Sequence, residues 1–139
     1  SFGNGAAMRV SGAGWLADEA PAVAALADQI RNEIVTRFGY DLSFTVDEIR
    51  PYYQFNETCQ ETVPQALVCA LSAVTFEDAI RNAISVGGDS DTVAAIAGSV
   101  AEALFGIPPG IAEQAKGYLP GDMVEVLGRF EGVTRKGRA

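Results

Sequence analysis

The chain has 139 residues, the size of one ordinary domain, and 48% of them are hydrophobic, which argues against intrinsic disorder. Eighteen acidic residues against ten basic ones give a formal net charge of −8. This charge argues against nucleic-acid binding, because neutralising phosphates requires an excess of Lys and Arg. The chain contains no histidine, which excludes Ser-His-Asp and Cys-His catalysis and every His-based zinc site. Any catalysis must therefore use carboxylates, a bound metal ion, or both.

The expected elements are taken in chain order. Residues 1–14 are rich in glycine, which predicts a loop. From Asp18 to Phe38 apolar residues recur every three or four positions, which predicts an amphipathic helix that ends at Gly39. Thr45 and Glu48 form a capping-box pattern at the start of a short helix that Pro51 ends.

The second half of the chain reads as further helices, with no segment that alternates like a strand. We therefore predict an all-α fold, a compact bundle of about six helices. The residues form a single domain over 1–133, followed by a basic tail over 134–139 that we expect to fray. The remaining helices are expected at 62–74, with Pro64 in the first turn, at 76–87, 92–105, 111–118 and 121–130.

Cys59 and Cys69 are expected in one helical segment, about 15 Å apart, which is too far for a disulfide. We expect two reduced thiols packed in the core of a cytoplasmic protein. No run of about 18 uncharged apolar residues is present, and no signal peptide opens the sequence. We therefore expect no membrane association.

The densest group of candidate ligands is the run Gly87-Gly88-Asp89-Ser90-Asp91-Thr92. Two carboxylates and a hydroxyl within four residues suit a hard cation such as Mg²⁺. The two glycines allow backbone angles that other residues resist. The same residues could instead cap the following helix, whose N-terminus attracts carboxylates without any metal. Spacing alone leaves the metal site and the helix cap equally supported.

A second candidate is the glycine-rich start of the chain, Ser1 to Arg9. Its glycines would let backbone N–H groups approach a phosphate closely. Phe2 offers a ring for stacking, and Arg9 could pair with an anion. A glycine-rich loop taken alone is a weak signal for phosphate binding.

Three segments in order resemble the ADP-ribosylglycohydrolase family. They are Gly3-Asn4-Gly5-Ala6-Ala7-Met8-Arg9, Cys59-x-x-Thr62-Val63-Pro64-x-Ala66-Leu67, and the run from Phe76 to Ile84 that leads into Gly87–Thr92. The resemblance covers the chain from Ser1 to about Gly106 and weakens beyond it. It implies an all-α bundle with a binuclear Mg²⁺ or Mn²⁺ site that hydrolyses the glycosidic bond between ADP-ribose and an acceptor.

Carried over by motif, the resemblance implies Asp89, Asp91 and Thr92 as metal ligands, with Asp89 and Asp91 as the catalytic carboxylates. It also implies an ADP-ribose pocket at the start of the chain, which would bind an ADP-ribosylated substrate or ADP-ribose itself. The residues of this pocket are Ser1, Phe2, Gly3, Asn4, Gly5 and Arg9.

The chain departs from the family pattern in two ways. It has no Thr-Asp-Asp-Thr segment, which supplies further acidic ligands in the family, and it lacks the family's histidine-bearing segment. We therefore expect half of the metal site and weak or no activity in the isolated chain. The alternatives are a non-enzymatic truncated homologue that binds ADP-ribose-like ligands or has a structural role, and a site completed by a homo-oligomer or by a separate N-terminal half.

Overall fold

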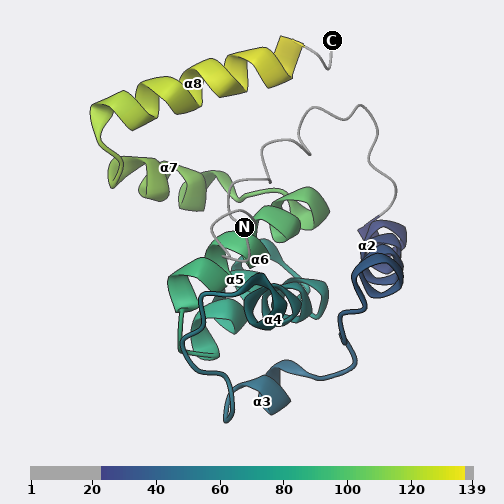
Figure 1. Ribbon diagram of the computed structural model, residues 1–139. Coiled ribbons are helices and arrows are strands. Elements are labelled where there is room, and N and C mark those ends of the chain that lie inside the picture. The colour runs from purple at the N-terminus through teal and green to yellow at the C-terminus, as the bar shows by residue number, and fades with distance from the viewer. Residues whose placement is uncertain (1–22, 137–139) are drawn as a thin grey trace.

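A computed structural model describes residues 23–136 of the chain, and in this range it contains seven helices and no strand (Figure 1). The predicted all-α class is confirmed. None of the described helices is long and apolar enough to span a membrane. The helices are α2 (Val23–Phe38), α3 (Val46–Ile49), α4 (Cys59–Leu71), α5 (Phe76–Ser85), α6 (Ser90–Phe105), α7 (Pro109–Gly117) and α8 (Gly121–Lys136).

Local signals in the sequence set several helix ends. Thr45 caps α3, and Glu48 completes the capping box by accepting hydrogen bonds from the Thr45 backbone and hydroxyl at 2.7 and 2.8 Å. The Thr75 hydroxyl caps α5 by accepting from the Asp78 N–H at 3.1 Å. Gly39, which follows α2, has a positive φ of 66°, a conformation that other residues adopt with strain. These boundaries agree with the sequence predictions.

The core lies between α4, α5 and α6, which pack directly on one another. Many of its side chains are small, so the three helices can approach closely. Gly98 illustrates this closeness, since a Cβ atom there would lie 3.0 Å from the Cδ1 of Ile80 on α5. The fully buried apolar members of the core are Ala66, Cys69, Ala70, Ala79, Ala83, Val93, Ala97 and Ala101, each 0% exposed.

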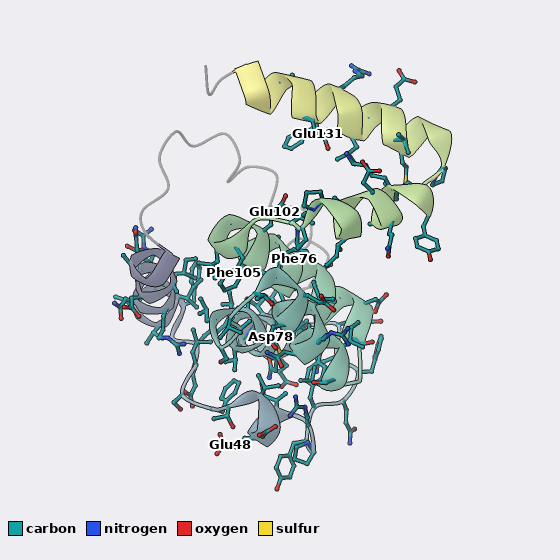
Figure 2. The ribbon with its side chains drawn as sticks, turned by 180° about the vertical axis from the view of Figure 1, so that it is seen from behind. Glu48, Phe76, Asp78, Glu102, Phe105 and Glu131 are labelled. Carbon is teal, nitrogen blue, oxygen red and sulfur yellow. The ribbon has the colours of Figure 1, made fainter. Side chains whose placement is uncertain are left out.

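The other helices attach to this core in different ways. Ile30 and Ile34 of α2 pack against the core cluster, and Arg31 donates to the Leu42 carbonyl at 3.0 Å. A smaller cluster around Phe76 includes Phe105 at the end of α6, and the two rings lie in the same part of the molecule (Figure 2). Ile111 of α7 also packs against this smaller cluster, whereas α8 lies farther from the three-helix core (Figure 1).

Several helices differ in extent from the predictions, and the differences at α4, α6 and α8 are the most informative. α4 starts at Cys59, three residues earlier than expected, so Pro64 lies inside the helix rather than in its first turn. The reason is local, because the Asn56 side chain accepts the Thr58 N–H at 2.8 Å and turns the chain into the helix early. α6 likewise starts early, at Ser90, and α8 continues to Lys136, so residues 134–136 are helical.

Candidate metal centre

The predicted ligand loop connects α5 to α6. Gly87 and Gly88 both have positive φ angles, of 72° and 58°, so the chain reverses over two left-handed residues. At Gly88 there is also no room for a side chain. A Cβ atom would lie 2.8 Å from the Gln54 carbonyl carbon and 2.9 Å from the Tyr53 ring. Gly88 therefore fixes the ligand loop directly against the segment that precedes α4.

Two of the three predicted ligands are buried in the structure, and the third is exposed to solvent. Asp89 is 8% exposed and Thr92 is 7% exposed, whereas Asp91 is exposed. All three belong to the start of α6, with Asp89 at the N-cap position and the other two in the first turn. The loop therefore combines two buried candidate ligands with one exposed carboxylate.

The alternative reading of this loop was a simple helix cap. Asp89 occupies the N-cap position of α6, but its side chain makes no capping hydrogen bond to the first turn. The caps of α3 and α5 do make such bonds. Asp89 is only 8% exposed, so its carboxylate lies inside the protein without capping α6.

Tyr53 is a neighbour of the loop that the sequence did not single out. Its hydroxyl is buried beside Thr62 and Asp89, and it makes no hydrogen bond of normal geometry within the described residues. Burial raises the pKa of Tyr53, and the negative charge of Asp89 raises it further. The only available sign in the sequence was an aromatic pair, Tyr52-Tyr53, directly after Pro51.

A groove of about 570 Å³ lies along the segment that supports Gly88, and Tyr53 is part of its lining. The groove combines aromatic rings with polar side chains and contains no basic residue. One of its polar atoms, Oε1 of Gln65, is buried without a hydrogen-bond partner in the structure. The lining residues are Phe44, Glu48, Ile49, Tyr52, Tyr53, Gln54, Phe55, Asn56, Glu61 and Gln65.

The chemistry of the loop fits Mg²⁺ or Mn²⁺, because carboxylate and hydroxyl oxygens are the ligands these hard ions prefer. The number of ligands does not suffice. Within residues 23–136 no group of three or more His, Cys, Asp or Glu side chains is arranged to hold a metal ion. The described residues can therefore supply one side of such a site, through Asp89, Asp91 and Thr92.

The second predicted site cannot be placed in the fold. The candidate ADP-ribose pocket residues Ser1, Phe2, Gly3, Asn4, Gly5 and Arg9 all lie outside the residues that the structure describes. The two cysteines are described. Both lie on α4 with free thiols, as predicted, and Cys69 is fully buried while Cys59 is half-buried. Burial raises the pKa of the Cys69 thiol to about 11.

The described residues thus form a helical domain in which the loop Gly87–Thr92 leads into a largely buried helix. Comparison with protein families makes this specific: a profile described as ADP-ribosylglycohydrolase matches residues 32–137. The match covers well over half of the chain, so the chain belongs to the ADP-ribosylglycohydrolase family. No curated protein and no solved structure shows significant similarity to it.

The extent of the match bears on two expectations. It continues through α7 and α8, so the likeness extends well past Gly106, beyond which the motifs themselves weaken. It begins at Asn32, so the likeness of the glycine-rich start of the chain rests on the motif alone. The ligand loop Gly87–Thr92 lies well inside the matched range.

Proposed function

We propose that this chain supplies one half of the Mg²⁺ or Mn²⁺ site of an ADP-ribosylglycohydrolase, through Asp89, Asp91 and Thr92. Family membership supports a glycohydrolase-like function. The observation that carries the proposal is the buried Asp89 in a loop that Gly88 fixes against the chain before α4. Its carboxylate is held at a set position, yet it does not cap the helix that it precedes.

The proposed reaction is hydrolysis of the bond between ADP-ribose and an acceptor group. A bound divalent ion would hold ribose hydroxyls, orient water and stabilise charge developing at the anomeric carbon. The chain's own part is to present oxygen ligands from a rigid loop. The Tyr53 hydroxyl, buried beside Asp89 without a regular hydrogen bond, is a further polar group that could meet a ligand at this position.

We expect the chain alone to bind the divalent ion weakly, because the affinity for the ion depends on the number of charged ligands. The test is calorimetric titration with Mn²⁺, with and without ADP-ribose. We compare the wild type with Asp91→Ala and with Asp28→Ala, which removes an exposed carboxylate on α2. Heat of binding that is lost in Asp91→Ala and kept in Asp28→Ala supports the proposal. Identical titrations of all three proteins would refute it.

Because no third acidic ligand is assembled within the described residues, a second function is a non-enzymatic protein that binds ADP-ribose-like ligands. The two functions separate in one assay with ADP-ribosyl-arginine. Release of ADP-ribose by the chain alone, lost in Asp89→Asn, supports hydrolysis. Binding of ADP-ribose without any turnover supports the non-enzymatic role.

A further inference from the structure

The Tyr53 side chain connects the core of the protein to the ligand loop. Its ring packs against the core cluster, and its backbone N–H donates to the Ile49 carbonyl at 2.9 Å, which holds the residue at the end of α3. A Cβ atom at Gly88 would lie 2.9 Å from Cε1 of the ring, the carbon next to the one that bears the hydroxyl. The hydroxyl end of the ring therefore lies against the loop residue that directly precedes Asp89.

The hydroxyl of Tyr53 is a buried group without a regular partner. Its oxygen is covered from solvent, and no group within residues 23–136 forms a hydrogen bond of normal geometry with it. Buried polar groups in proteins nearly always have such a partner, because a buried donor without one loses its interaction with water and gains nothing in return. An exception directly against a candidate ligand loop therefore needs a physical explanation.

Two oxygen groups lie near this hydroxyl, and they differ in strength as acceptors. The Thr62 side chain, which is 0% exposed on α4, donates its proton to the Asn56 carbonyl at 3.1 Å, so toward Tyr53 it can act only as an acceptor. The second group is the carboxylate of Asp89, whose negative charge acts on Tyr53. Hydrogen bonds to an ionised carboxylate are about twice as strong as those between neutral groups. Asp89 is therefore the stronger of the two acceptors.

We propose that Tyr53 is a positioning residue for the ligand loop, and that its hydroxyl donates a hydrogen bond to the Asp89 carboxylate when this carboxylate binds a divalent ion. The inference rests on the proposed function of the loop. Carboxylates that bind metal ions are themselves hydrogen-bonded by a second protein group, which orients them and strengthens metal binding. Hydrogen bonds at catalytic sites are often long or poorly aligned in the ligand-free protein and become regular only in the complex. This accounts for a buried hydroxyl that lies near Asp89 and lacks a regular bond.

A purely structural role for Tyr53 would require only its ring. A phenylalanine would make the same contacts with the core and with Gly88, and it would bury no hydroxyl. Removal of the hydroxyl should therefore leave the ion-free protein at least as stable as the wild type, because the lost group has no regular partner to leave behind. The positioning role and the packing role thus predict different results for the same variant.

The first measurement is calorimetric titration of Tyr53→Phe and the wild type with Mn²⁺. We expect the affinity for Mn²⁺ to fall about tenfold or more in the variant, as it does for other groups that orient a metal-binding side chain. The matched control is Tyr118→Phe, which makes the same chemical change at a site 89% exposed after α7 and should keep the wild-type affinity. Wild-type affinity in Tyr53→Phe would overturn the proposal.

Urea denaturation with and without Mn²⁺ separates positioning from packing. Without the ion, the urea midpoint of Tyr53→Phe should equal or exceed that of the wild type. With the ion, the midpoint of the wild type should rise further than that of Tyr53→Phe, because tighter binding to the folded state gives more stabilisation. A lower midpoint of Tyr53→Phe in the absence of Mn²⁺ would assign the hydroxyl a structural role and overturn the positioning role.

Titration of Asp91→Ala distinguishes the failure of this inference from the failure of the proposed function. If Asp91→Ala loses Mn²⁺ binding and Tyr53→Phe keeps the wild-type affinity, only the role of Tyr53 is wrong. If the wild type and Asp91→Ala respond identically to Mn²⁺, the proposed metal site is wrong, and the positioning role of Tyr53 is wrong with it.

Discussion

Helices α6 and α8 have the same length of 16 residues and opposite relations to solvent. In α6, Val93, Ala97 and Ala101 are 0% exposed, whereas Met123, Val126 and Val133 of α8 are between 55% and 64% exposed. The main difference is that two other helices, α4 and α5, pack against α6. α6 contacts both α4 and α5 closely, because small residues line the approach. The apolar residues of a helix therefore predict that part of its surface favours burial, but they do not predict which element covers that surface.

The largest expected effect tests how tightly the ligand loop is fixed. Gly88→Ala should destabilise the protein by about 3 kcal/mol, because the new Cβ atom meets backbone atoms and its φ of 58° is strained. Gly87→Ala has a similar φ of 72° but meets no atom within 4 Å, so about 1 kcal/mol is expected. Urea denaturation measures both. Equal losses would mean that close packing at Gly88 contributes nothing.

The next effect sharpens the contrast between α6 and α8. Val93→Ala should cost about 2 kcal/mol, because it opens a cavity at a fully buried site. Val126→Ala, at a site 64% exposed, should change the free energy of unfolding by less than about 0.5 kcal/mol at low protein concentration. Both are measured by urea denaturation. A large loss at Val126 under these conditions would mean that α8 is packed within the monomer.

A smaller effect concerns the caps, which distinguish α5 from α6. Thr75→Ala should destabilise the protein by about 1 kcal/mol, because it removes the acceptor for the Asp78 N–H. Thr36→Ala, at an exposed position on α2, serves as the control and should be nearly neutral. Thermal denaturation followed by circular dichroism compares the two. A neutral Thr75→Ala would contradict the capping role.

The smallest expected effect concerns pH and the core of α4. The pKa of Cys69 is raised to about 11 by burial, from an ordinary value of 9.0, so the folded state retains this proton more strongly than the unfolded state. Its contribution to stability is complete below pH 9 and is lost as the pH rises toward 11. At pH 9.5 the loss should be less than about 1 kcal/mol, measured by urea denaturation, and smaller in Cys69→Ala.

Part of the candidate site could be predicted from the sequence. The dense oxygens of Asp89, Asp91 and Thr92 and the adjacent glycines are a local pattern, and the caps at Thr45 and Thr75 depend on residues only three positions apart. The position of Tyr53 could not be predicted in this way. Its position beside Asp89 results from the close approach of two segments 36 residues apart in sequence, which no local pattern encodes.

The sequence by itself determined the all-α class and several helix ends, because periodicity, caps and glycine conformations act over a few residues. Only the tertiary structure decided three other properties. Asp89 is buried while Asp91 is exposed, Gly88 lies against Tyr53 and Gln54, and Val126 of α8 is left exposed. Burial depends on which surfaces meet, and that depends on the packing of α4, α5 and α6 as a whole.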